Sequence, residues 1–479
     1  MRIFLTLFLV LGACQCFAIK PNVLLIYVDD LGYGDTEVYG HPIVKTPNID
    51  RLAEEGIRFT QFYSPSALCS PSRAGLLTGR TPYRTGVKNW IPDHSGVSLS
   101  RDEVTIAQIL KEAGYRTAVV GKWHLNGGLH LERAPQPRDF GFDYQYGLAA
   151  WVKNEKAEEA GFGKLFPDNM FRNYRPVGDT EKFSADLVTE EAIKWIGNIE
   201  AQAPFFLYLA YTEVHTPVAS PSRYLDMYDQ YLTEESRRYP WAYYMDWVSR
   251  PYRGKGEYYA NVSYLDSQIG RILEALDKQS QTKNTLVIFS SDNGPLTSEA
   301  AMRWEVAMAG ETNGLRGKKR HLFEGGIRVP GIFRWPSKFE AGVTDVPATA
   351  LDVLPTITDL LDLELPSARV IDGESIASLL TGEPGFERKG ALFWSLATPD
   401  GLEYAIRVGN WKLLLDPEGV PKYLFDLKAD PYEITNLLET RIEIVRELTQ
   451  SFVEMRTSVA RDMANWEYDE TKTPDTKQN

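Results

Sequence analysis

The feature that most constrains the fold is a set of short, almost uninterrupted apolar runs. Residues 22–30 (NVLLIYVDD), 204–210 (PFFLYLA) and 285–291 (TLVIFSS) are of this kind, and residues 117–120 form a shorter one. Apolar runs of this length, bounded by polar residues, are typical of strands that are buried on both faces of a parallel sheet. The sequence therefore predicts a buried, mostly parallel sheet.

Helical patterns alternate with these runs. We expect helices within residues 46–59, 71–78, 105–113, 183–196 and 262–276. This alternation predicts an α/β fold, in which a large mixed, mostly parallel sheet is covered by helices on both faces. Functional groups of such folds lie beyond the carboxyl ends of the strands. The polar residues that stand there in this chain are Asp29, Asp30, His215, Asp292 and Asn293.

The pattern changes after about residue 365. Four short strands separated by turn residues, within 391–396, 403–408, 411–415 and 423–426, predict an antiparallel meander. A terminal helix is expected at 437–463. The resulting division is a signal peptide at 1–18, a catalytic domain at 19–365, a C-terminal α+β subdomain at 366–467 and a polar tail at 468–479.

The N-terminus has the pattern of an export signal, in which Arg2 precedes an apolar run at residues 3–11. Residues 16–18 (CFA) fit an ordinary cleavage before Ile19, which is the interpretation we favour. Residues 11–14 (LGAC) alternatively resemble a lipoprotein box, which would make Cys14 a lipid-bearing N-terminus. Either interpretation predicts a secreted or periplasmic protein, and no other apolar run predicts a transmembrane segment.

Cys69 is the only cysteine left once Cys14 and Cys16 are removed with a signal peptide, so no internal disulfide is expected. A lone cysteine is often a buried apolar residue. However, Pro71 suits the first turn of a helix, which places Cys69 at a helix N-terminus. Backbone N–H groups there favour a tetrahedral anion and activate a thiol.

Charge narrows the function further. The formal net charge of −13 argues against a nucleic-acid partner, which requires a basic surface. The three carboxylates and one amide at two strand ends, Asp29-Asp30 and Asp292-Asn293, offer hard oxygen ligands that suit calcium or magnesium better than zinc or copper. Each pair alone could instead cap a helix or form a turn.

The segment Cys69-Ser70-Pro71-Ser72-Arg73, with residues 74–80 (AGLLTGR) behind it, resembles the signature of the sulfatases. The resemblance covers roughly residues 20–438 and is strongest to the arylsulfatase A-like branch of the alkaline phosphatase superfamily. It implies that a separate formylglycine-generating maturation enzyme oxidises Cys69 to formylglycine. It also implies one Ca²⁺ ion, with ligands at Asp29, Asp30, Cys69, Asp292 and Asn293.

Three further motifs match the family in order. They are residues 121–124 (GKWH), residues 213–217 (EVHTP), and residues 315–319 (LRGKK) running into 323–330 (FEGGIRVP). The catalytic set that the resemblance implies is Cys69, Arg73, Lys122, His124, His215 and Lys319, with Lys318 as the alternative to Lys319.

The resemblance also implies the reaction. One hydroxyl of hydrated formylglycine attacks the sulfur, while Asp292 and the metal favour the ionised form of that hydroxyl. His215 protonates the departing alcohol, and His124 takes the proton of the second hydroxyl as sulfate is expelled. Arg73 and Lys122 hold residue 69 and the sulfate in place.

Two other functions remain open from the sequence. One is a phosphonate or phosphodiester hydrolase of the same superfamily, and the other is a non-catalytic protein that binds sulfated glycans. For a sulfatase, export and the aromatic- and arginine-rich stretch at 221–259 favour a sulfated carbohydrate over a small aryl sulfate. That stretch is either a packed surface hairpin or a lid that stacks on sugar rings.

Overall fold

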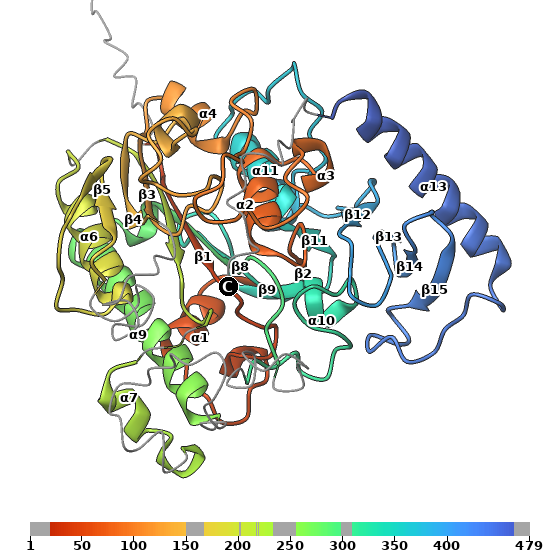
Figure 1. The fold of residues 1–479 in the computed structure, drawn as a ribbon, viewed down its shortest axis with the longest axis horizontal. Helices are drawn as coiled ribbons and strands as arrows, with labels where there is room; N and C mark the ends of the chain where they lie inside the picture. The colour runs from red at the N-terminus through yellow and green to blue at the C-terminus, as the bar shows by residue number, and fades with distance from the viewer. Residues whose placement is uncertain are drawn as a thin grey trace, which may run out of the picture.

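An 11-stranded sheet forms the centre of the protein (Figure 1). The computed structural model describes residues 20–149, 167–200, 203–216, 218, 220–232, 255–297 and 309–463. The hydrogen-bonded order of the strands is β10 (Gly342–Thr344), β2 (Ile57–Tyr63), β9 (Arg328–Arg334), β8 (Thr285–Ser291), β1 (Asn22–Val28), β7 (Phe205–Tyr211), β3 (Arg116–Gly121), β4 (Tyr144–Leu148), β5 (Met170–Arg172) and β6 (Arg175–Pro176), with β11 (Ala348–Thr349) beside β2.

The middle of this sheet is parallel. β1 pairs with β8 on one side and with β7 on the other, and β7 pairs in turn with β3, all in parallel. Every residue of β1, β7 and β8 is buried, which explains why these segments are continuous apolar runs. The predicted mixed, mostly parallel sheet is confirmed.

Helices cover both faces of the sheet. Alternate residues of β1 point to opposite faces: Leu24 and Ile26 join one apolar cluster, and Val23 and Leu25 join the other. The first cluster is completed by α1 (Pro47–Glu54), α6 (Ser184–Gly197) and α9 (Gly256–Lys278). The second is completed by α2 (Cys69–Thr78), α4 (Ile106–Glu112), α11 (Val353–Leu360) and α12 (Ala377–Leu380). Figure 1 shows α6 and α9 grouped together, apart from α2 and α11.

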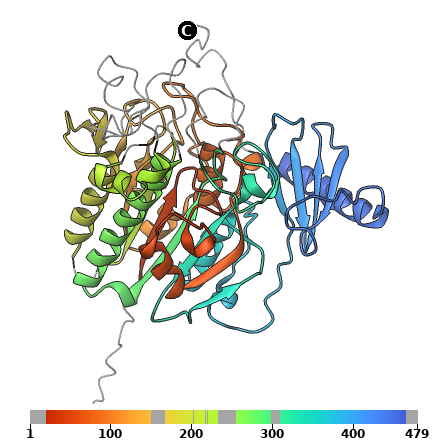
Figure 2. The same ribbon diagram turned by 90° about the horizontal axis from the view of Figure 1, so that it is seen from below.

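The C-terminal part forms the predicted antiparallel meander. Its strands are β12 (Leu392–Ser395), β13 (Tyr404–Val408), β14 (Trp411–Leu415) and β15 (Pro421–Asp426). One face packs against Leu322 and Phe323 of the main domain, and the other is covered by α13 (Ile442–Arg461). Figure 2 shows this sheet and α13 together on one side of the molecule.

Strand β9 was not predicted, because Pro330 and Gly331 lie within it and both residues disfavour strands. The structure accommodates Pro330 at an irregularity in the pairing of β2 with β9, between Phe59 and Phe62. The hydroxyl of Tyr39 lies 2.9 Å from both the amide N and the carbonyl O of Gly331. A side chain distant in sequence thus stabilises this interior strand.

Some predicted boundaries were wrong. α9 begins at Gly256, six residues before the predicted start, because its first turn is buried and Tyr258 donates a hydrogen bond to Asp35 at 2.6 Å. α13 begins at Ile442 and not at residue 437. The short strands β5 and β6 were not predicted.

Several predictions fall partly or wholly outside the described residues. They concern the signal peptide at 1–18, the end of the C-terminal subdomain from residue 464, the polar tail at 468–479 and the middle of the 221–259 stretch. What is described of that stretch is α7 (Ser222–Asp226), η3 (Asp229–Tyr231) and the start of α9. In the described part of the chain, no helix combines the length and the apolar composition needed to cross a membrane. The remaining short helices are α3 (Pro82–Thr85), α10 (Glu324–Ile327), η1 (Glu37–Tyr39), η2 (Pro137–Phe140), η4 (Thr282–Asn284) and η6 (Ala350–Asp352).

Candidate active site

Four neighbouring strands, β8, β1, β7 and β3, end at the same edge of the sheet, and each is followed by polar residues. Hydrogen bonds between backbones continue past the strand ends. The amide of Asp292 donates to Val28 O at 3.0 Å, and the amide of Lys122 donates to Ala210 O at 2.8 Å. The amide of Val214 donates to Asp29 O at 3.0 Å. The strand-end segments are therefore held side by side, as the sequence predicted.

An oxygen-rich cluster lies at this edge, formed by Asp29, Asp30, Asp292 and Asn293, all fully buried. The Asp30 amide donates to Asp292 Oδ1 at 3.1 Å, and Asn293 Nδ2 donates to Asp30 Oδ1 at 2.7 Å. Within the described residues, Asp29 Oδ1 and Asn293 Oδ1 are buried without a hydrogen-bond partner. Buried oxygens of this kind are costly unless a donor or a cation faces them. The cluster thus fits Ca²⁺, which prefers carboxylate and amide oxygens.

Three buried cations face the three carboxylates. Lys122 Nζ lies 2.6 Å from Asp29 Oδ2, and Lys319 Nζ lies 2.6 Å from Asp30 Oδ1. Arg73 donates to Asp292 Oδ2 through Nε at 3.0 Å and through Nη2 at 2.6 Å. These pairs fix positive charge beside the oxygen cluster, where an anionic substrate group can bind.

The pKa shifts follow from this arrangement. Burial raises the pKa of Asp29, but Lys122, together with His215, Arg73 and Lys319, outweighs burial and holds that pKa well below its usual range. Burial and then the Asp29 charge raise the pKa of Asp292. The site therefore resists carrying all of its negative charges at once, and a bound divalent cation would relieve this repulsion.

Cys69 is the first residue of α2 and is buried. Burial lowers the pKa of Lys319, whereas the charges of Asp30 and then Cys69 raise that pKa above its usual value. Likewise, Asp29 and then Cys69 raise the pKa of Lys122 against the effect of burial. The sulfur therefore lies within electrostatic range of both lysines.

Arg73 is one helical turn beyond Cys69 and is fully buried. Besides Asp292, its guanidinium contacts Lys122 O at 3.1 Å and the Tyr208 hydroxyl at 3.3 Å through Nη1. Tyr208 was not among the predicted site residues, because it lies inside an apolar strand and has no motif of its own. Arg73 therefore ties α2 to the ends of β3 and β8.

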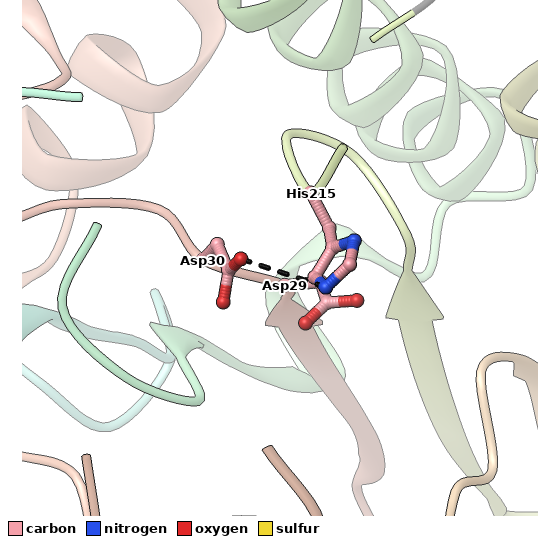
Figure 3. A group of neighbouring side chains, drawn as sticks. All are labelled: Asp29, Asp30 and His215. Carbon is pink, nitrogen blue, oxygen red and sulfur yellow. Dashed lines mark ion pairs between the residues drawn. The ribbon is translucent and has the colours of Figure 1, made fainter. Parts of the chain in front are cut away.

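His215 lies next to the acidic pair, as Figure 3 shows. Its Nε2 is 3.7 Å from Asp30 Oδ2, and together with Asp29 the three side chains form a group that could hold a metal. Nδ1 lies 2.6 Å from Thr216 O, so we assign the ring proton to Nδ1. Burial lowers the pKa of His215 to about 4, and the ring is neutral at pH 7 in this state.

His124 lies in the segment that follows β3. Its Nε2 is 3.1 Å from Ile91 O, so we assign the ring proton to Nε2. Within the described residues, Nδ1 is buried without a hydrogen-bond partner. Burial and then Lys122 lower the pKa of His124 to about 3, which leaves Nδ1 free of a proton at pH 7.

Lys319 reaches the site from the loop between β8 and α10. Its amide donates to Pro295 O at 2.9 Å, and Gly294 N donates to Gly326 O at 2.9 Å. A Cβ on Gly294 would lie 2.0 Å from Gly325 O, so only glycine permits this approach of the two backbones. Lys318 is half-buried, and its side chain makes no hydrogen bond within the described part of the chain. Of the two adjacent lysines, Lys319 is the one that enters the site.

A small hollow of about 40 Å³ adjoins these groups. Lys122, His124 and Thr212 line it on the side of the site. The other described residues that line it are Asp93, Trp123, Asn126, Gly128, Leu129, Leu148 and Ala149. Asp93 was not predicted, since it stands in a loop outside every motif and only the folded chain brings it there.

The chain matches the protein-family model "Sulfatase" over residues 21–363. It also matches the model "N-sulphoglucosamine sulphohydrolase, C-terminal" over residues 315–458. Together the two models cover the main domain and the C-terminal sheet.

Curated relatives agree with these matches. Bovine (Bos taurus) arylsulfatase A is 33% identical over 487 aligned positions, which cover 93% of this chain and 89% of the relative. The N-acetylgalactosamine-6-O-sulfatase of Bacteroides thetaiotaomicron is 29% identical, with 91% of this chain and 93% of the relative covered. Among solved structures, Ps i-CgsB in complex with k-i-k-neocarrahexaose aligns with a TM-score of 0.76 and 27% identity. That alignment covers 94% of this chain and 96% of the other.

Proposed function

Because the chain belongs to the sulfatase family and is a sulfuric ester hydrolase, we propose that it desulfates a carbohydrate with a formylglycine nucleophile made from Cys69. The observation that carries this proposal is the position of Cys69. It begins a buried helix within electrostatic range of Lys122 and Lys319, beside a cluster of buried carboxylates. An anion that reacts at position 69 would therefore meet fixed positive charge.

Hydrated formylglycine at position 69 supplies two geminal hydroxyls, of which one takes up the sulfuryl group and the other permits its release. Lys122, Lys319 and Arg73 bind the sulfate oxygens and offset the charge that develops as the S–O bond breaks. Their ion pairs with Asp29, Asp30 and Asp292 hold them in place before the substrate arrives.

Two histidines move protons in this proposal. His124 Nδ1 carries no proton at pH 7 and accepts one from a hydroxyl of residue 69. His215 donates a proton to the departing alcohol oxygen, which requires that the ring first be protonated. A sulfate bound beside His215 raises the pKa of the ring and favours that state.

We assign one Ca²⁺ ion to Asp29, Asp30, Asp292 and Asn293, together with residue 69. The two buried oxygens described above support this assignment. When bound, the ion supplies a Lewis acid for the sulfate oxygens and favours ionisation of the nucleophilic hydroxyl.

A sulfated carbohydrate is the substrate class that the relatives support. One is named an N-acetylgalactosamine-6-O-sulfatase, and one solved neighbour was crystallised with the oligosaccharide k-i-k-neocarrahexaose. The proposal also includes export through residues 1–18, a secreted or periplasmic location, and maturation of Cys69 by a formylglycine-generating enzyme. It divides the chain into a catalytic domain at 19–365 and a C-terminal subdomain at 366–467.

Mass spectrometry of the peptide that contains residue 69 tests the nucleophile. Protein co-produced with a formylglycine-generating enzyme is expected to carry the aldehyde and to release sulfate from a sulfated monosaccharide. Cys69→Ala is expected to keep its circular dichroism spectrum and to lose turnover. A fully active preparation with an unmodified thiol refutes the nucleophile, and faster turnover of a nitrophenyl phosphonate than of every sulfate ester refutes the reaction.

A further inference from the structure

The hollow beside the active site has one acidic side chain among its described lining residues, Asp93. It shares this hollow with Lys122 and His124, the groups assigned above to the sulfate and to a proton. The carboxylate is close enough to His124 to act on the ring, because it opposes burial and Lys122 in setting the pKa of His124. A carboxylate so near a site for a sulfate anion would repel that anion, so it weakens sulfate binding unless it binds another part of the substrate.

The segment that carries Asp93 is fixed on both sides. The Ile91 amide donates to the Ser70 hydroxyl at 3.0 Å, which ties the segment to the residue after Cys69. Ile91 O accepts from His124 Nε2 at 3.1 Å, and the His94 amide donates to Gly127 O at 2.7 Å. Asp93 is therefore held at a set position relative to residue 69 and His124.

The rest of the hollow is largely apolar. Leu129 and Ala149 are buried, and Leu148 completes this apolar side. The amide of Asn126 is already engaged, since Nδ2 donates to Pro135 O at 2.7 Å and Oδ1 accepts from Gly128 N at 3.0 Å. A hollow lined by both a carboxylate and apolar side chains suits a pyranose ring, which presents hydroxyl donors at its edge and C–H groups on its faces.

We propose that Asp93 binds hydroxyl groups of the sugar unit that bears the sulfate, and that this unit is a pyranose with no charged group other than that sulfate. The inference rests on the proposed function and names the substrate class of the same site. A carboxylate offers about four acceptor positions on its two oxygens, enough for two neighbouring hydroxyls in addition to contacts within the protein. Its negative charge also repels a uronate or a second sulfate placed on this side of the ring.

Steady-state kinetics of Asp93→Ala and Asp93→Asn test the proposal. The substrates are 4-nitrophenyl sulfate, which has no sugar hydroxyls, and the monosulfated neutral monosaccharide that the wild type turns over fastest. Loss of hydrogen bonds to a charged acceptor is expected to lower kcat/KM for the sugar about 10- to 100-fold, mainly through KM. The fold-decrease in kcat/KM for the sugar is expected to be at least about 10 times the fold-decrease in kcat/KM for 4-nitrophenyl sulfate.

The preference between substrates of different charge gives a second readout. Asp93→Asn is expected to narrow the preference of the enzyme for the monosulfated sugar over a disulfated one. Asp102→Asn is the matched control, because Asp102 is exposed in the same region and does not line the hollow. Melting temperatures of all three variants control for folding.

An equal loss on both substrates overturns the inference, because it means that Asp93 acts through His124 or through the fold. No loss on the sugar overturns it as well. Failure of the proposed function gives a different result from failure of this inference. If the proposed function is wrong, neither the wild type nor any variant at position 93 releases sulfate from a sugar.

Discussion

The Lys319 ammonium lies 2.6 Å from Oδ1 and 2.8 Å from Oδ2 of Asp30, across 289 positions of sequence. Both side chains are buried. The contact joins the loop before α10 to the end of β1, and it holds a positive charge at the oxygen cluster.

Lys319→Ala is expected to lower kcat/KM for sulfate esters about 100- to 1,000-fold, because one preorganised group that stabilises the transition state is lost. Lys318→Ala is the matched control and is expected to stay within about 3-fold of the wild type, since a half-buried lysine whose side chain makes no hydrogen bond to the described residues contributes little. Assays with 4-nitrophenyl sulfate measure both. A larger loss in Lys318→Ala contradicts the assignment of the two lysines.

Calcium is expected to stabilise the folded protein. A free calcium concentration of about 100 times the dissociation constant adds about 2.7 kcal/mol to the free energy of unfolding. Removal of calcium with a chelator is therefore expected to lower the melting temperature, and renewed calcium to restore it.

Asn293→Ala is expected to weaken this response to calcium, because Asn293 Oδ1 is one of the two oxygens of the cluster that are buried without a hydrogen-bond partner among the described residues. Asn198→Ala, a change at an exposed helix end, is expected to preserve it. Differential scanning calorimetry with and without calcium makes the comparison. Equal calcium responses in the two variants contradict the assigned site.

Stability is expected to depend on pH through Glu433. Lys412 Nζ lies 2.9 Å from Glu433 Oε1 and 2.9 Å from Glu324 Oε1, and all three residues are fully buried. Burial raises the pKa of Glu433 to about 7, while Lys412, together with Arg328 and Arg407, holds the pKa of Glu324 low against the effect of burial. Below its unfolded pKa, near 4.3, Glu433 carries a proton in both states. Between that value and about 7 the folded state binds the extra proton, so stability falls as pH rises.

Glu433→Gln removes this titration. Relative to the variant, the wild type is expected to lose up to about 1.4 kcal/mol of stability per pH unit across that window. Urea unfolding from pH 5 to 8 measures the difference. Glu439→Gln, at an exposed position, is expected to follow the wild type. Parallel pH profiles of the wild type and Glu433→Gln would falsify the shift.

Gly294→Ala is expected to displace the loop that carries Lys319, because the added Cβ would lie 2.0 Å from Gly325 O. Overpacking of this kind costs about 1–3 kcal/mol of stability, and a displaced Lys319 lowers turnover as well. Gly342→Ala is the control, since a Cβ there meets nothing within 4 Å. Melting temperatures and turnover measure both effects, and a fully active Gly294→Ala contradicts the close approach.

Much of the fold could be predicted from the sequence, because burial on both faces of a strand is recorded in the chain as a continuous apolar run. The positions of Asp29, Asp292 and His215 followed from the same pattern, since parallel strands bring their carboxyl ends to one edge. β9 escaped prediction because Pro330 and Gly331 disfavour a strand, and contacts with Tyr39 and β2 override that preference.

The sequence by itself thus determined the parallel core and the types of residue that stand at its strand ends, because each depends on local order along the chain. Only the tertiary structure decided that Lys319 and not Lys318 meets Asp30, and that Asp93 lines the hollow beside His124. These relationships join segments that are distant in sequence or belong to different loops. The physical reason is that packing and hydrogen bonds between such segments set them, and no local pattern in the chain records those contacts.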